Sequence, residues 1–302
     1  MKSIYNQFYF AVDSNFSERI DKHAYRKENG YEASDKVFSY STRKQLLEGA
    51  KTFSNYIKEN TDIKLVKNIT ADIINAYLDF KKEKGNTQNS IDTDAKIIKK
   101  LEILTEKTYN LKNLNWAEKM EIPIAYQKNS EDRGAKAQMS NTDLEKIISY
   151  CKEHKCQSTY SIQLESFLGI RVREIVLIKL KDIDYDKNTV KITGKGNKEI
   201  TRTLTSEQMQ LIKEIQAQKY DKDKLFNIKD ATVNAQLRKI EDRLKLERHS
   251  VHDIRRTVAQ NLYDKCREEG MDRKQALEQA SKWLSHGEKR ETMLVKSYIR
   301  AW

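Results

Sequence analysis

Hydrophobic positions recur at helical spacing in two parts of this chain. In the first part, apolar residues share one helical face, with charged residues opposite, at Leu46, Leu47, Ala50, Phe53 and Ile57. Thr70 is placed to cap a second helix, and Ile91 lies on a third. Residues 1–39 have no clear period and remain unassigned. We therefore expect a small helical bundle over residues 40–125.

A polar segment separates this bundle from the rest of the chain. It follows Pro123, the only proline, and has little apolar character, so we place a linker at residues 126–139. Ser140 and Asp143 then form a capping-box signature ahead of an apolar helical pattern. A second domain is therefore expected over residues 140–302.

One strand pair interrupts the helical pattern of the second domain. Runs from Val190 to Thr193 and from Ile200 to Leu204 flank the polar turn GKGNKE, which predicts an antiparallel hairpin. Helical spacing resumes from Ser206 to the end. The sequence predicts a mainly α protein, with an N-terminal helical bundle and a mixed α/β domain that is mostly helical and carries a small antiparallel sheet.

Composition narrows the class of protein. Lysine and arginine outnumber acidic residues by 57 to 45, and the net charge of +12 favours a polyanionic partner, above all nucleic acid. No run of about 18 apolar residues occurs, so no membrane partner is expected. The start, MKSIYNQFYF, lacks the apolar region of a signal peptide. With only three cysteines, we expect the protein to lie in the reducing cytoplasm. A DNA partner would make it nucleoid-associated.

Six residues of chemical interest lie in order through the second domain: Arg171, Lys195, His252, Arg255, His286 and Tyr298. Two arginines can hold the non-bridging oxygens of one phosphate, because each guanidinium presents its donors in a rigid fork. Tyr298 can attack the phosphorus if a base or nearby positive charge assists, since a free phenol has a pKa of about 10. The set predicts cleavage of a DNA phosphodiester without a metal.

The segments that carry these residues resemble motifs of the tyrosine recombinase (phage integrase) family. FLGIRVREIVLIKLKDID resembles the first arginine motif, TGKGNKE the lysine hairpin, HSVHDIRRT the H-x-x-R motif and WLSHG the L-G-H motif. Tyr298 in VKSYIRAW matches the nucleophile, and Glu174 the acidic residue that orients catalytic groups. The resemblance covers roughly residues 140–302, the catalytic domain, and extends weakly to residues 40–125, the core-binding domain. The interval from His286 to Tyr298 is longer than in compact members.

The resemblance implies a role for each residue. Arg171 and Arg255 would clamp the scissile phosphate, and the histidine of the L-G-H motif would donate to a phosphate oxygen. Lys195 would protonate the 5′ oxygen as it leaves. His252 would accept the proton of Tyr298 or hydrogen-bond the phosphate. The 3′-phosphotyrosyl intermediate conserves the energy of the broken bond, so neither a cofactor nor a metal is implied.

The resemblance also implies partners and a biological role. The partners would be double-stranded DNA recombination sites, bound by a homotetramer, and an accessory directionality factor is a further candidate. We favour integration and excision of a mobile genetic element, because residues 1–39 look unlike the start of a compact chromosome-dimer resolvase. Such a resolvase, a type IB topoisomerase-like enzyme and a catalytically silent DNA-binding protein are the alternatives. Only four residues follow Tyr298, so assembly through a tail is not expected unless this segment itself is exchanged.

Other residues of the sequence are candidates for competing sites. Three aspartates alternate in KDIDYDKN, as a two-metal nuclease would require, but such a stretch is more often a solvated loop: Asp182, Asp184 and Asp186. Three potential zinc ligands lack a second pair: Cys151, His154 and Cys156. Tyr263 is the main rival of Tyr298, but it shares the expected helix of Arg255 and is interpreted as core or surface. The ordinary alternative for Arg255 is an ion pair with Asp253 or Glu247.

Overall fold

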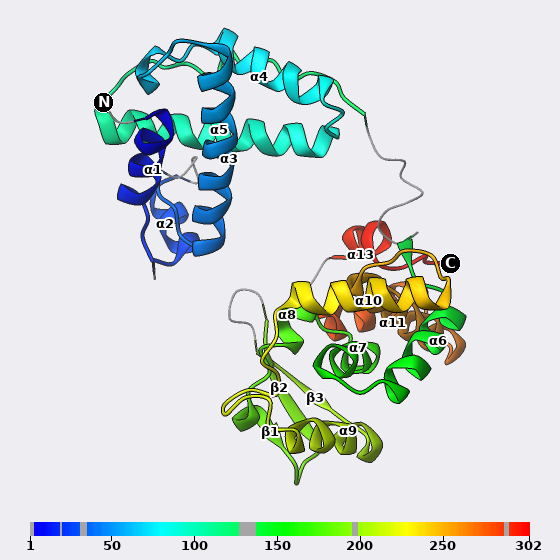
Figure 1. Cartoon of the computed structure of the whole chain (residues 1–302). Coiled ribbons are helices and arrows are strands. Elements are labelled where there is room, and N and C mark those ends of the chain that lie inside the picture. Colours follow the sequence, from blue (N-terminus) through cyan, green and yellow to red (C-terminus); the bar gives the residue numbers. More distant parts are fainter. Residues whose placement is uncertain (1–2, 19, 31–34, 127–136, 195–198, 287–289) are drawn as a thin grey trace. The chain divides into compact units, whose positions relative to one another are not determined.

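The computed structural model describes residues 3–18, 20–30, 35–126, 137–194, 199–286 and 290–302. Two compact units make up the chain, unit 1 at Met1–Lys128 and unit 2 at Asn129–Trp302 (Figure 1). Helices dominate both units, and unit 2 adds one small antiparallel sheet, which confirms the predicted fold class. Residues 127–136 of the expected linker lie outside the described residues.

Unit 1 is a helical bundle. Its elements are α1 (Ile4–Ser14), α2 (Lys22–Glu28), α3 (Tyr40–Asn60), the 3-10 turn η1 (Val66–Asn68), α4 (Ala71–Glu83) and α5 (Gln88–Tyr109). Helix α1 packs against both α3 and α5. Its Phe8 is fully buried and stacks on Phe53, with 6.2 Å between ring centres. The segment that the sequence left unassigned therefore supplies part of this core.

Unit 2 surrounds a buried helix. Its helices are α6 (Asn141–Glu153), α7 (Gln157–Leu168), α8 (Val172–Ile175), η4 (Leu180–Asp182), α9 (Ser206–Ala217), α10 (Asp230–Leu244), α11 (Val251–Glu268), α12 (Arg273–Trp283) and α13 (Glu291–Ser297). Helices α6, α10 and α11 all pack on α7. Nine of the twelve α7 residues are buried, which explains why this helix lacks a polar face.

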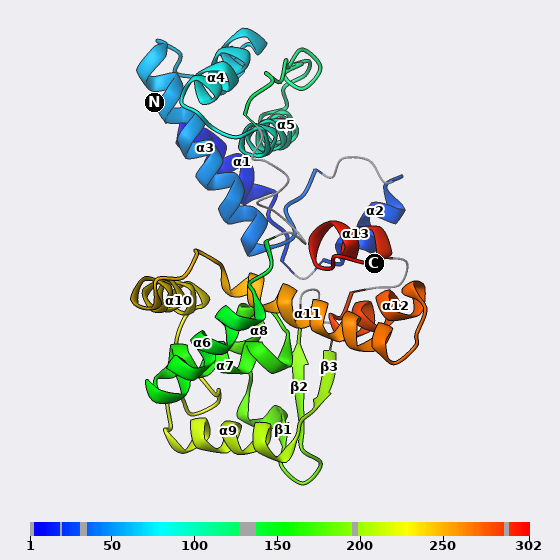
Figure 2. The same ribbon diagram turned by 90° about the vertical axis from the view of Figure 1, so that its right-hand side faces the viewer.

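The sheet has three strands in the order β1-β2-β3, at Ile183–Asp184, Thr189–Thr193 and Glu199–Thr203. Strands β2 and β3 form the predicted hairpin, with Thr189 opposite Thr203 and Thr193 opposite Glu199. The short β1 was not predicted. Figure 2 shows α9 beneath the sheet, at the end away from α11 and α12. The sheet, α7 and α9 share one apolar core.

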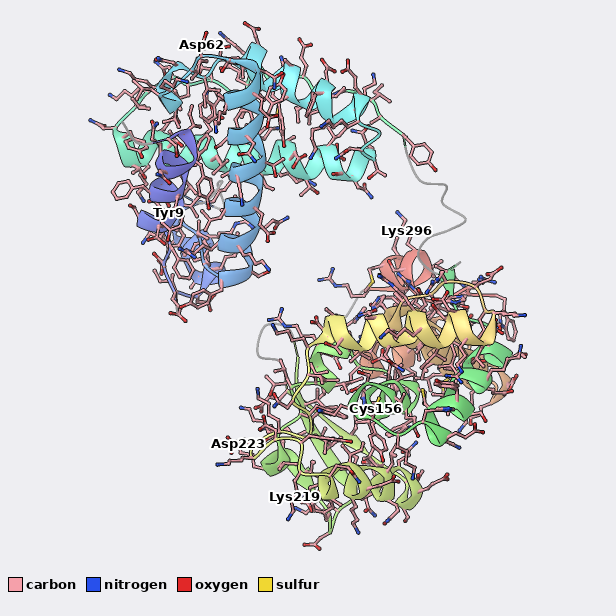
Figure 3. The ribbon with its side chains drawn as sticks, in the orientation of Figure 1. Tyr9, Asp62, Cys156, Lys219, Asp223 and Lys296 are labelled. Atoms are coloured by element: carbon pink, nitrogen blue, oxygen red, sulfur yellow. The ribbon has the colours of Figure 1, made fainter. Side chains whose placement is uncertain are left out.

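Charged side chains cover both units (Figure 3). None of the helices in the described residues is long and apolar enough to cross a membrane.

Candidate active site

A cavity of about 550 Å³ in unit 2 brings together four of the six expected catalytic residues, with Glu174 beside them. It is lined by Arg171, Glu174, Gly194, Ile200, His252, Arg256, Ser285, His286, Arg290, Met293, Ser297 and Tyr298. These residues come from α8, the β2–β3 hairpin, α11, the segment after α12, and α13. Lys195 lies outside the described residues, although Gly194 before it lines the cavity.

Glu174 holds two arginines at one side of the cavity. Its Oε1 accepts from Nη1 of Arg171 at 2.8 Å, and its Oε2 accepts from the Arg171 backbone N–H at 2.8 Å. Oε2 also lies 3.7 Å from Nη1 of Arg255. One carboxylate from the first turn of α8 therefore fixes two guanidinium groups that are 84 residues apart in sequence, and it balances part of their charge.

Arg255 lies behind the cavity wall, with a side chain that is only 1% exposed. Its Nη2 donates to the Leu284 carbonyl at 2.8 Å and lies 3.5 Å from Nε2 of His286. Burial lowers the pKa of Arg255 from its ordinary value, yet a guanidinium starts so far above neutrality that it stays charged. Its Nε is buried without a hydrogen-bond partner among the described residues. This arginine is fixed in place and keeps an unused donor.

Tyr298 lies between two imidazole rings. Its ring centre is 5.3 Å from that of His252 and 5.1 Å from that of His286, and both histidines meet it at steep angles. The Arg255 guanidinium lies 5.8 Å from the same ring centre. With 6% exposure, Tyr298 is an ordered part of the cavity wall, surrounded by the groups that the chemistry of a phenol nucleophile requires.

Both histidines are neutral at physiological pH. Burial lowers the pKa of His252 to about 4, and the nearby Arg256 and Arg255 add to the effect. Burial followed by Arg255 and Arg171 lowers the pKa of His286 to about 4. Neutral imidazoles can accept a proton or share a hydrogen bond. The positive charge of the cavity therefore resides on its arginines.

Arg256 connects the helix of His252 to the end of α13, one residue before Tyr298. Its Nε donates to the Ser297 carbonyl at 2.9 Å, and its Nη1 pairs with Asp253. Gln138 donates to the Tyr298 carbonyl at 2.6 Å. Asp253 thus pairs with Arg256 and not with Arg255. The ion pair between Arg255 and Asp253, considered as an ordinary alternative, was wrong.

Sequence reasoning missed a contact that joins β3 to the end of α12. Arg202 on β3 lies over the Trp283 ring, 4.9 Å from its centre, and donates to the Trp283 carbonyl. Burial lowers the pKa of Arg202 to about 10. Trp283 in turn packs on Gly169, where a Cβ would lie 1.7 Å from the indole Cη2. Gly169 in LGIR could be noticed in the sequence, but its contact with Trp283 could not.

Sequence reasoning also missed Glu165 of α7, which is fully buried. Neither carboxyl oxygen has a hydrogen-bond partner among the described residues. Burial raises the pKa of Glu165 well above its ordinary value, although Arg255 opposes this shift. Burial thus favours the neutral form of this carboxyl, and the nearby arginines favour its charged form.

The competing candidates have other surroundings. Tyr263 is fully buried, and its hydroxyl donates to the Trp302 carbonyl at 2.8 Å. Asp184 accepts from the backbone N–H groups of Asp186 and Lys187, as in a solvated turn. His154 stacks on the ring of Tyr150. Within the part of the chain that the structure describes, no three His, Cys, Asp or Glu side chains are grouped as metal ligands.

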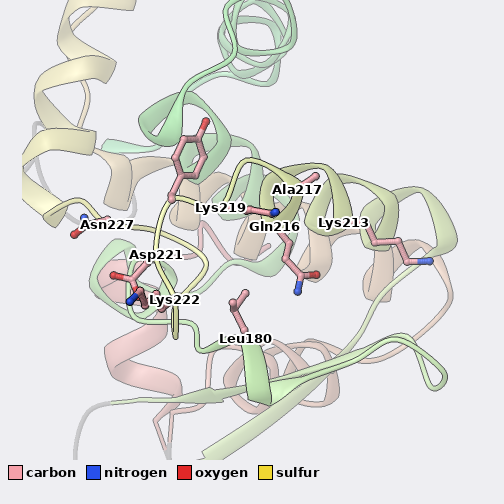
Figure 4. Close-up of a pocket in the computed structure, with 9 residues that line it drawn as sticks. Leu180, Lys213, Gln216, Ala217, Lys219, Asp221, Lys222 and Asn227 are labelled. Atoms are coloured by element: carbon pink, nitrogen blue, oxygen red, sulfur yellow. The ribbon is translucent and has the colours of Figure 1, made fainter.

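A larger cavity of about 810 Å³ lies beside α9, at the other end of unit 2. Lys213 and Gln216 from α9 face it, with Asp221 and Lys222 from the following loop (Figure 4). Lys219, also labelled in Figure 3, completes an exposed polar rim. Among the described residues its lining includes neither an arginine nor a histidine, and it shares no residue with the lining of the candidate active site.

One family model matches this chain, and several solved structures share its fold. Residues 137–293, more than half of the chain, match the model of the phage integrase family. The fold is similar to XerH site-specific recombinase bound to difH substrate, at a TM-score of 0.62 and 18% identity over 97% of this chain and 90% of that one. It is also similar to a lambda integrase tetramer bound to a Holliday junction, at a TM-score of 0.63 and 13% identity over 90% and 75%. The Tn1549 transposon integrase in complex with circular intermediate DNA gives a TM-score of 0.54 and 10% identity over 97% and 98%. No curated protein matches by sequence.

Proposed function

This chain belongs to the phage integrase family, and on that premise we propose that it is a site-specific tyrosine recombinase that cleaves and rejoins DNA through a 3′-phosphotyrosyl intermediate. The observation that carries the proposal is the position of Tyr298 between His252 and His286, beside Arg255. The basic net charge of the chain supports a DNA partner.

In the cleavage step, Oη of Tyr298 attacks the scissile phosphorus. Its proton passes to neutral His252, whose low pKa rises when the negatively charged phosphate enters the cavity. Arg171 and Arg255 stabilise the charge on the non-bridging oxygens, and losing one such donor typically slows a reaction about 100- to 1000-fold. His286 donates a further hydrogen bond.

The phosphorus–oxygen bond to the 5′ oxygen breaks as the bond to the tyrosine forms. The leaving oxygen takes a proton, and we assign this proton to Lys195 through its match to the lysine hairpin. Attack of a 5′ hydroxyl on the phosphotyrosine reverses every step and restores the phenol. The number of phosphodiester bonds is unchanged, so we propose that strand exchange needs neither a cofactor nor a metal.

We assign the chain to integration and excision of a mobile element, acting as a homotetramer on two DNA sites. The likeness to lambda integrase and to the Tn1549 transposon integrase supports this role. A chromosome-dimer resolvase is the second candidate, because the likeness to XerH covers as much of the chain. An accessory directionality factor belongs to the first role. Junction sequencing of the DNA beside the coding sequence distinguishes the two, since only a mobile element leaves a joined circle and an empty site.

Adduct mapping tests the reaction itself. The purified chain is incubated in EDTA with DNA fragments that flank its coding sequence, and complexes that survive SDS are digested and sequenced. We expect one tyrosyl peptide, containing Tyr298, and one DNA position. Adducts that form only with added magnesium, or through another residue, would contradict the proposal.

A further inference from the structure

The turn that presents His286 is built on a serine in a backbone conformation that favours glycine. Helix α12 ends in a Schellman motif, in which the Ser285 N–H donates to the Lys282 carbonyl and the His286 N–H to the Ser281 carbonyl. Ser285 has φ +58°, in the left-handed region where a Cβ is unfavourable and glycine is the usual residue. The serine side chain therefore adds backbone strain that a glycine at this position would avoid.

Within the described part of the chain, the hydroxyl of Ser285 makes no hydrogen bond that would offset this cost. Oγ is buried and has no hydrogen-bond partner among the described residues. A serine at the end of a helix normally uses its hydroxyl on nearby backbone groups. Here the backbone N–H groups of Leu284, Ser285 and His286 already donate to carbonyls of α12, so they need no hydrogen bond from the hydroxyl.

Ser285 also lies within the chemistry of the cavity. It lines the same cavity as Arg171 and Tyr298. The carbonyl of the preceding Leu284 accepts from Arg255, and the next side chain is His286. One tight turn therefore accepts a hydrogen bond from Arg255 and places Ser285 and His286 in the lining of the cavity. A buried unpaired donor in a strained position points to a ligand that completes it.

We propose that Ser285 is a further substrate-binding residue, whose hydroxyl donates a hydrogen bond to a non-bridging oxygen of the scissile phosphate. This rests on the proposed function and adds a neutral donor to the arginines and His286. A neutral donor binds the anion without repelling the two guanidinium groups, and the rigid turn fixes its direction before the phosphate arrives.

Monomeric orthovanadate tests this proposal, because it has the charge and oxygens of phosphate and forms five-coordinate complexes. Its dissociation constant is obtained from the rise of the melting temperature with vanadate concentration. Ser285→Gly removes both the hydroxyl and the strain, whereas Ser285→Ala removes the hydroxyl and keeps the strain. Both should weaken vanadate binding about 10- to 100-fold, the usual range for a hydrogen bond to a charged group.

Lys245→Gly is the matched control. Lys245 ends α10 at φ +54°, with the same pair of backbone hydrogen bonds, and its exposed side chain lies outside the cavity lining. This variant should bind vanadate as the wild type does. If Ser285→Gly and Ser285→Ala also bind normally while Arg171→Ala loses binding, the role of Ser285 is wrong and the proposed function stands. If the wild type binds no better than Arg171→Ala, the phosphate site itself is wrong, and both proposals fail.

Discussion

The guanidinium of Arg202 lies 4.9 Å from the ring centre of Trp283 and donates to the Trp283 carbonyl oxygen. Arg202 belongs to β3, which follows the turn of Lys195, and Trp283 is the last residue of α12, three residues before His286. The contact therefore joins the strand that follows the proposed general acid to the segment of His286, the histidine that we propose binds phosphate.

Arg202→Met should destabilise unit 2 by about 1–3 kcal/mol, because the half-buried Trp283 carbonyl loses its donor. Urea unfolding measures this loss. Arg248→Met is the control: Arg248 also donates to a carbonyl and to a carboxylate, but at an exposed site, so its removal should cost under about 1 kcal/mol. Equal losses in the free energy of unfolding would show that the Arg202 contact contributes no more to stability than an exposed contact does.

Gly169→Ala should lower the stability of unit 2 more than an ordinary glycine substitution does. Gly169 has φ +56°, and its Cβ would lie 1.7 Å from the Trp283 ring, a clash that backbone and indole must both move to relieve. We expect a loss above about 3 kcal/mol and a lower rate of DNA cleavage, because Arg171 follows two residues later. Gly270→Ala has φ +90° with open space around it, and should cost only the left-handed strain of about 1–2 kcal/mol. Similar melting temperatures for the two variants would contradict the clash.

Stability should depend on the protonation of His252. An unfolded imidazole has a pKa of about 6.5, and burial in the folded protein lowers the pKa of His252 to about 4. The unfolded state therefore binds more protons between these values. The contribution of His252 is complete above about pH 6.5 and is lost as the pH falls towards 4. The difference in free energy of unfolding between the wild type and His252→Gln should shrink over this window, and a constant difference would contradict the lowered pKa.

Glu174→Gln tests the carboxylate that holds both arginines. The amide keeps the shape of the side chain, but it removes the negative charge beside Arg171 and Arg255. We expect cleavage to slow about 10- to 100-fold because the guanidinium groups lose their fixed geometry, while affinity for DNA stays equal or rises. Filter binding and single-turnover cleavage separate these effects. Unchanged cleavage would mean that the arginines keep their positions without the charge.

Local patterns in the sequence were sufficient for much of the fold. The apolar stripe from Leu46 to Ile57 lies on α3 as expected, and the two runs that flank GKGNKE form the predicted hairpin. Ser140 caps α6 as expected, by accepting from the N–H of Asp143. Residues 1–39 resisted assignment because α1 has apolar residues on several sides, and only its packing between α3 and α5 explains them.

Side-chain partners distant in sequence could not be predicted. Helical spacing favours a pair of Asp253 with Arg256, three residues on, over Arg255, two residues on. Nothing in the sequence, however, shows that Glu174 approaches Arg255. Glu165 looked like an ordinary helical glutamate, because nothing nearby in sequence shows that it is buried. The order of the motifs, in contrast, indicated the residues that surround the cavity.

Covalent trapping on the mapped DNA site tests the central claim most directly. Tyr298→Phe keeps the ring between the two histidines and removes only the hydroxyl, so it should bind the DNA and form no SDS-resistant adduct on a nicked substrate. Tyr263→Phe, at the buried tyrosine whose hydroxyl donates to the Trp302 carbonyl, is the matched control and should form the adduct. An adduct that survives Tyr298→Phe, or one that is lost in Tyr263→Phe while DNA binding is retained, would contradict the assignment of Tyr298 as the nucleophile.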